Sequence, residues 1–191
     1  MKKIFLMAAM ALASVSSFAQ QAVGTFTIQP KIGLNLANLT DGDADLRVGL
    51  AAGAEFEYQI SDIFSLSAGA LYSMQGCKNT AAGVDLTTKL DYINVPVLAN
   101  VYVVKGLAVK LGIQPGFNVT HEVKAEKGST NGTTDIPGFK SVDFSIPVGL
   151  SYEINNFVID GRYNFGVTKI ADDVDSKNSV FQFTLGYKFA L

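Results

Sequence analysis

The stretch RVGLAAGAEFEYQI, residues 47–60, alternates strictly between two kinds of side chain. Its even positions are apolar, and its odd positions are polar, charged or very small. Successive side chains of a β-strand point to opposite faces, so the stretch predicts a strand with one apolar and one polar face. Ordinary strands have about five or six residues, whereas a tilted strand that crosses a bilayer needs about nine to eleven. The length of this stretch therefore favours a membrane-spanning barrel.

The same alternation recurs in seven further segments, which predict an all-β fold. These are residues 26–36, 63–74, 90–103, 107–119, 142–154, 157–168 and 180–189. Short turns at Ser61-Asp62, Lys105-Gly106 and Asn155-Asn156 alternate with the longer loops 37–46, 76–89, 120–140 and 171–179. Short periplasmic turns and longer external loops are typical of outer-membrane barrels. We therefore predict an eight-stranded antiparallel up-and-down transmembrane β-barrel in a Gram-negative outer membrane, with both termini in the periplasm.

The start of the chain has the features of a secretory signal peptide. A basic start, MKK, precedes an apolar run over residues 4–15 and the small residues Ser17 and Ala19. The run is shorter than the roughly twenty residues that a spanning helix needs. We expect a signal peptide over residues 1–19, cleavage between Ala19 and Gln20, and one barrel domain over 20–191. Cys77 is the only cysteine, so neither a lipid-bearing N-terminal cysteine nor an internal disulfide is expected.

Aromatic residues on the apolar face gather near the strand ends, which predicts that this face meets lipid. The short-turn end has Phe26, Tyr58, Phe64, Tyr152, Phe157, Tyr187 and Phe189, and the long-loop end has Tyr72, Phe117, Phe144, Tyr163, Phe165 and Phe181. The alternative is a soluble, lipocalin-like barrel that binds a ligand on an inward apolar face. Two aromatic girdles and alternating loop lengths argue against that alternative.

The opposite face has glycines and charges of balanced sign, as a packed interior requires. The predicted lumen network is Lys31, Arg47, Glu55, Glu57, Lys110, Asp143, Glu153, Asp160, Arg162 and Lys188. This network is either a narrow ion path or a salt-bridged plug that fills the bore. Wide aqueous channels come with about sixteen strands or more, so eight strands favour the plug.

Four prolines lie inside the predicted strands, where proline removes a hydrogen-bond donor from the ladder. They are Pro30, Pro96, Pro115 and Pro147. A closed barrel has no free edge to accommodate them. We expect a β-bulge or a strand end at each of these positions.

Several stretches resemble the PorT-like outer-membrane β-barrel family, whose members are of OmpA/OmpX type in size. They are KIGLNLANL (31–39), ALYSMQGCK (70–78), LDYINVPVLANVYV (90–103), LGIQPGFNV (111–119), GRYNFGVTKI (161–170) and FQFTLGYKF (181–189). The resemblance covers nearly the whole chain after the signal peptide and implies an integral outer-membrane protein. It implies no single activity, although the family is named after a member that acts in secretion.

Candidate chemistry is sparse. The sole histidine, His121, is followed by Glu122 and Val123, with no serine two residues on. The acidic stretch 41–45 departs from the calcium-binding EF-hand loop at Leu46 and Ala52. We therefore expect no enzyme activity, no cofactor and no metal. The formal net charge of −2 does not indicate nucleic-acid binding.

The expected role is structural or interactive, through the long loops, with an accessory role in secretion or envelope assembly as the alternative. Expected partners are outer-membrane lipid and lipopolysaccharide, the barrel-assembly machinery and an unidentified extracellular ligand of the loops. We expect the protein to be a monomer.

Overall fold

The computed structural model describes residues 21–40, 45–81, 84–127, 130–135, 138, 140–171 and 175–191. The predicted signal peptide, with its cleavage site between Ala19 and Gln20, lies outside the described residues. So do residues 41–44 of the acidic stretch. Among the residues that the structure does describe, no helix is long and apolar enough to cross a membrane.

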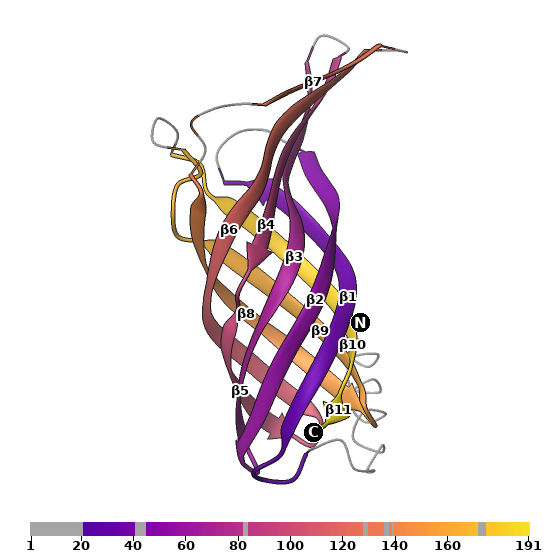
Figure 1. The fold of residues 1–191 in the computed structure, drawn as a ribbon, viewed down its shortest axis with the longest axis vertical. Helices are drawn as coiled ribbons and strands as arrows, with labels where there is room; N and C mark the ends of the chain where they lie inside the picture. Colours follow the sequence, from indigo (N-terminus) through magenta and orange to yellow (C-terminus); the bar gives the residue numbers. More distant parts are fainter. Residues whose placement is uncertain are drawn as a thin grey trace, which may run out of the picture.

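Antiparallel strands close into a ring, as Figure 1 shows. The strands are β1 (Phe26–Leu39), β2 (Asp45–Ser61), β3 (Phe64–Ala81), β4 (Val84–Asn94), β5 (Val97–Val104), β6 (Leu107–Lys127), β7 (Thr130–Asp135), β8 (Val142–Ile154), β9 (Phe157–Gly166), β10 (Asn178–Tyr187) and β11 (Phe189–Ala190). β4 and β5 follow one another between β3 and β6, so together they fill one position. The pairing of β10 with β1 closes the ring of eight positions. The predicted fold class is confirmed.

Tight turns join the strands at one end of the ring. Gly106 has a φ of 78° and Asn155 a φ of 56°, the left-handed conformation that two-residue hairpin turns require. Both ends of the described chain lie at this end. The Gly24 amide donates to the Gln59 carbonyl at 2.8 Å, and the Leu191 amide donates to the Phe26 carbonyl at 2.9 Å.

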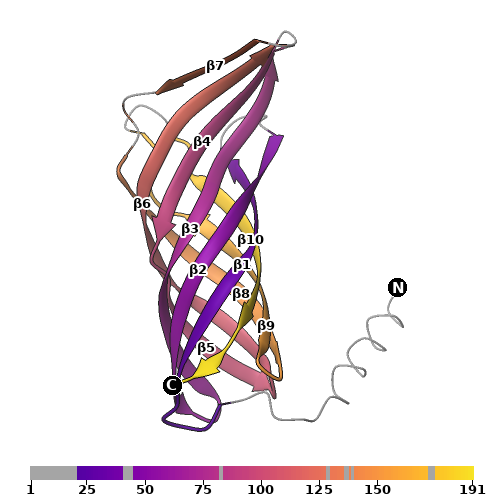
Figure 2. The ribbon, with the colours of Figure 1, turned by 45° about the vertical axis from the view of Figure 1, so that its right-hand side comes forward.

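The predicted loops 76–89 and 120–140 are wrong in large part, because most of their described residues form strands. β3 continues to Ala81 and pairs with β4, and the upper half of β6 pairs with β7. These hairpins rise beyond the ring as a four-stranded extension of β3, β4, β6 and β7 (Figures 1 and 2). Outside the bilayer both faces of a strand meet water, so the apolar alternation that marks a spanning strand is not needed there.

The apolar face of the ring points outward. Side chains such as Ile32, Leu111 and Phe183 are more than half exposed, whereas the charged residues of the opposite face are buried. The soluble lipocalin-like alternative, which needs the reverse arrangement, is therefore wrong. Aromatic pairs lie at both ends of this outer face, with ring centroids 4.4 Å apart for Phe26 and Tyr58.

Interruptions of the ladder accommodate the first two in-strand prolines. Pro96 lies at the break between β4 and β5, which is a strand end as predicted. Pro30 pairs with Ala54 of β2 in regular register. On its other side β1 pairs with β10 from Lys31 onward and with β11 at Thr27 and Ile28. Pro30 therefore has no ladder partner on that side, so its missing amide hydrogen leaves no acceptor unpaired in the ladder.

The other two prolines follow the same rule. Pro115 lies opposite the break between β4 and β5, where its carbonyl accepts from the Val95 amide at 2.8 Å. Pro147 pairs with Asn164 of β9, but the pairing of β8 with β6 is interrupted between Ser145 and Val148. The expectation of a bulge or a strand end is wrong at Pro30, Pro115 and Pro147, because each lies inside its strand and no register shift occurs there.

A matched pair of Ile→Arg substitutions tests the outward face. Ile113 lies midway between the short turn that precedes β6 and the aromatic Phe117, and it is 60 % exposed. Ile63 lies in a short turn and is 64 % exposed. We expect Ile113→Arg to lower the free energy of unfolding by about 2–4 kcal/mol in lipid vesicles, and Ile63→Arg by about 0–1 kcal/mol. Equal losses in urea-induced unfolding would contradict the assignment of this face to the bilayer.

Candidate functional site: a charge-paired barrel interior

The lowest layer of the interior, nearest the short turns, is centred on Lys188. Its ammonium contacts Glu57 at 3.0 Å and Glu153 at 2.8 Å. The Tyr102 hydroxyl donates to Glu57 at 2.7 Å, and the Ser65 hydroxyl donates to the same carboxylate oxygen at 2.9 Å. Side chains from separate strands thus converge on one buried cation and bind the walls of the barrel to one another.

The next layer, which we call the central cluster, contains Lys31, Glu55, Lys110, Asp160 and Arg162, all fully buried. Arg162 donates to Glu55 at 2.9 Å and to Asp160 at 2.8 Å. Lys31 contacts Glu55 at 2.8 Å, and Lys110 contacts Asp160 at 2.9 Å. Each carboxylate therefore faces more than one cation. The network spans the bore from β1 and β2 to β6 and β9.

The net charges of the lowest layer and the central cluster cancel. The central cluster has three cations and two carboxylates, and the lowest layer has one cation and two carboxylates. Together four cations face four carboxylates. Unpaired charge in a dry interior costs several kcal/mol per ion, so this balance is a condition for folding.

Glycines on neighbouring strands make room for the long charged side chains. Gly69 is the ladder partner of Glu55, and Gly149 is the ladder partner of both Lys110 and Arg162. A Cβ atom at Gly149 would lie 2.6 Å from the Cβ of Arg162, and one at Gly69 would lie 2.7 Å from the Cγ of Glu55. Small and long residues thus alternate across the bore, as its narrow width requires.

The upper part of the interior contains an ion pair that alternation does not predict. Arg47 contacts Asp91 at 2.9 Å and also donates to the carbonyl of Gln75. The Tyr72 hydroxyl donates to the same aspartate at 3.0 Å. A register shift between β4 and β6 at Asp91 and Tyr92 turns both side chains inward. Strict alternation assigns Asp91 to the lipid face, where a carboxylate is unfavourable. A carboxylate at this position was therefore the one signal in the sequence that a bulge changes the face here.

Asp143 is the one member of the predicted network without a cation among the described residues. It accepts from the Thr168 hydroxyl at 2.5 Å and from the Asn178 amide at 3.3 Å. The other nine predicted residues lie in the lowest layer, in the central cluster or at the upper ion pair. The structure therefore brings eight of them together in two adjoining layers, and places Arg47 and Asp143 above them.

An apolar plug closes the interior at the long-loop end. Leu90, Tyr92 and Ile170 pack together, with Leu39 against them. The segment after β9 holds Ile170 in place, because the Ile170 amide donates to the Ser176 carbonyl at 3.0 Å. Among the described residues, charged side chains below and packed apolar side chains above thus occupy the interior.

Chemistry outside the interior is limited. His121 is exposed, and its Nδ1 lies 3.2 Å from the Asn118 Oδ1. Cys77 is a buried free thiol. The Lys169 ammonium donates to the Asp175 carboxylate, which keeps the pKa of that carboxyl below its usual value. Within the described part of the chain, no group of acidic, histidine or cysteine side chains could hold a metal ion.

The sequence matches the family described as "Outer membrane protein beta-barrel domain" over residues 18–172. The chain belongs to this family. This membership places the protein in the outer membrane of a Gram-negative cell and agrees with the outward apolar face. None of the curated proteins matches the sequence.

Solved outer-membrane barrels have the same fold. The attachment invasion locus protein Ail of Yersinia pestis is 17 % identical, with 88 % of this chain and 100 % of that chain covered and a TM-score of 0.52. The Neisserial surface protein A, NspA, is 17 % identical, with 86 % and 97 % covered and a TM-score of 0.52. At these identities the likeness concerns the fold alone.

Two Glu→Gln substitutions test how strongly the barrel depends on its central cluster. Glu55→Gln leaves Lys31 and Arg162 with one fewer carboxylate, so we expect the free energy of unfolding to fall by about 3–5 kcal/mol. Glu122→Gln is the matched control. Glu122 contacts Lys89 at 3.6 Å and its side chain is 34 % exposed, so we expect a loss of about 0–1 kcal/mol. Similar small losses in vesicle-bound urea unfolding would show that the cluster is not needed for stability.

Proposed function

We propose that the protein is a non-enzymatic outer-membrane barrel that presents a binding surface outside the cell. The observation that carries this proposal is the four-stranded extension of β3, β4, β6 and β7 beyond the ring (Figure 2). An extension of paired strands is a far more rigid platform than four separate loops. Rigid surfaces lose less entropy on binding than flexible ones.

The packed interior supports a binding role over transport. Ion pairs fill the bore from Glu57 to Asp91, and the apolar plug lies above them. We therefore infer that the charges are a structural plug rather than an ion path. The long-loop end of the barrel is then the surface that we propose for recognition.

The absence of enzyme activity is part of the proposal. Acyl transfer and hydrolysis need a nucleophile and a base within hydrogen-bond reach. His121, the one histidine, is exposed, and its ring lies beside the side chain of Asn118.

The orientation is also proposed. With the short turns in the periplasm, both termini are periplasmic and the extension faces outward. Monomeric assembly, contact with lipopolysaccharide and delivery by the barrel-assembly machinery belong to this proposal. The word "attachment" in the name of the Yersinia pestis protein is in keeping with a surface-interaction role.

A second candidate is an accessory role in secretion or envelope assembly. It follows from the resemblance of stretches such as residues 31–39 and 90–103 to the PorT-like family. Both candidates use the same extension, and they differ in whether its partner is foreign to the cell or part of its own envelope.

Trimming the extension tests the binding role. Joining Lys78 to Thr87, and Val123 to Thr134, through Asn-Gly turns would shorten both hairpins at existing ladder pairs while leaving the ring intact. In pull-downs from intact outer membranes, we expect the amount of partner captured by the doubly trimmed protein to fall at least tenfold. This corresponds to about 1.4 kcal/mol of binding free energy. Each singly trimmed variant serves as a control for the other hairpin.

Unchanged capture by the doubly trimmed variant would contradict the proposed role of the extension.

The orientation is checked in a Cys77→Ser background. We expect a membrane-impermeant maleimide to label Thr134→Cys in intact cells, and Asp62→Cys only after permeabilisation. The reverse pattern would place the extension in the periplasm.

A further inference from the structure

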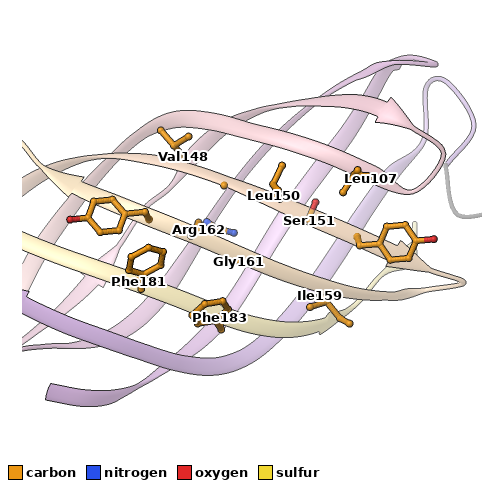
Figure 3. A pocket seen from close by; sticks show the side chains of 12 residues that line it. Leu107, Val148, Leu150, Ser151, Ile159, Gly161, Arg162, Phe181 and Phe183 are labelled. Carbon is orange, nitrogen blue, oxygen red and sulfur yellow. The ribbon is translucent and has the colours of Figure 1, made fainter. Parts of the chain in front are cut away.

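The outer wall of the barrel contains a groove centred on Gly161 (Figure 3). Gly161 lies on the outward face of β9, between the outward Ile159 and Tyr163. Its ladder partners are Leu150 on β8 and Phe183 on β10. The groove around Gly161 has a volume of about 490 Å³, which is within the size range of small-molecule sites.

Apolar side chains from four strands line this groove. Leu107 comes from β6, Val148 from β8, and Phe181 from β10. Figure 3 shows these side chains on the outer side of the strands, around Gly161. Arg162 and Ser151 line the floor but are buried, so their polar groups belong to the interior. The surface that an occupant would meet is therefore apolar.

The two ends of the groove differ. At one end Tyr163 and Phe181 pack edge to face, with ring centroids 4.7 Å apart. At the other end lies Leu107, the first residue of β6, beside its ladder partner Tyr152. The exposed Lys105 lies in the turn directly before β6. The groove thus extends from Tyr163 and Phe181 toward the short-turn end of the barrel, the end at which Lys105 lies.

We propose that this groove holds one acyl chain of a phospholipid from the leaflet at the short-turn end, with its phosphate near Lys105. This proposal rests on the proposed function, because the orientation given there makes the leaflet at the short-turn end the periplasmic one. The groove is part of the surface that faces the bilayer, so hydrocarbon is what surrounds it. Its apolar lining and the cation at its short-turn end match the two halves of an anionic phospholipid.

The shape of the groove favours a chain over a second copy of the barrel. A barrel wall is convex, so another barrel would bridge the depression instead of filling it. Leu150 and Phe183 flank Gly161 on the neighbouring strands, and Ile159 and Tyr163 flank it along β9, so the depression has a raised rim. A stretch of one hydrocarbon chain fits such a depression, and the charged head of the same lipid lies outside the apolar wall.

A matched pair of leucine substitutions tests the site. A Cβ atom at residue 161 would lie 3.4 Å from the ring of Phe183, so Gly161→Leu adds bulk where the groove lies and needs only a small shift of that ring. The control is Ala68→Leu on β3, an exposed position on the far side of the ring. Both variants add bulk to the lipid-facing wall, but only the first fills the groove.

The measurement is native mass spectrometry of the full barrel after equilibration with phosphatidylglycerol and lipopolysaccharide in detergent. We expect the wild type and Ala68→Leu to retain one phosphatidylglycerol, and Gly161→Leu to retain roughly tenfold less. Lys105→Gln should weaken retention of phosphatidylglycerol more than that of a phospholipid without net charge.

Equal retention by Gly161→Leu and Ala68→Leu would overturn the proposal. Retention of lipopolysaccharide in place of phospholipid, or a dimer that Gly161→Leu dissociates, would also overturn it. Failure of the proposed function gives a different result. In that case the wild type itself fails to show the heat-modifiable gel migration of a folded membrane barrel, or the maleimide labelling reverses.

Discussion

Closure of the sheet is the constraint on which the rest of this structure depends. A ring of strands leaves no edge, so every spanning segment satisfies its backbone hydrogen bonds within the barrel. Closure at eight positions also makes the bore too narrow for bulk water. Charged side chains inside it must therefore neutralise one another directly. Arg162, between Glu55 and Asp160, shows the outcome most clearly.

The same constraint explains the composition of the inward face. The longest charged side chains of the central cluster lie beside a glycine of the neighbouring strand, as Lys110 and Arg162 lie beside Gly149. The outward face has no such need, because lipid adapts to its shape. Gly161 is an outward glycine, and its result is a groove rather than a tight contact. Glycine thus has two roles in this barrel, according to the face on which it lies.

Much of the ring could be predicted from the sequence, because a lipid-facing strand must alternate. Residues 47–60 show this well, with Leu50 and Phe56 outside and Glu55 and Glu57 inside. Alternation failed where the pairing shifts at Asp91, since a bulge changes the face without changing the local composition. It also failed beyond the bilayer, where the strand continuations of β3 and β6 face water on both sides. The ion-pair partners depend on register around the ring, which periodicity alone does not define.

An accessibility scan along β9 tests the closed, charge-filled bore most directly. Single spin-labelled cysteines at residues 157–165, in a Cys77→Ser background, would be exposed to a lipid-soluble and a water-soluble relaxation agent in vesicles. A closed, charge-filled bore predicts a two-residue period. The lipid-soluble agent reaches the Ile159 and Tyr163 positions, and neither agent reaches the Asp160 and Asn164 positions. Access of the water-soluble agent to the Asp160 and Asn164 positions would contradict it and indicate an open aqueous channel.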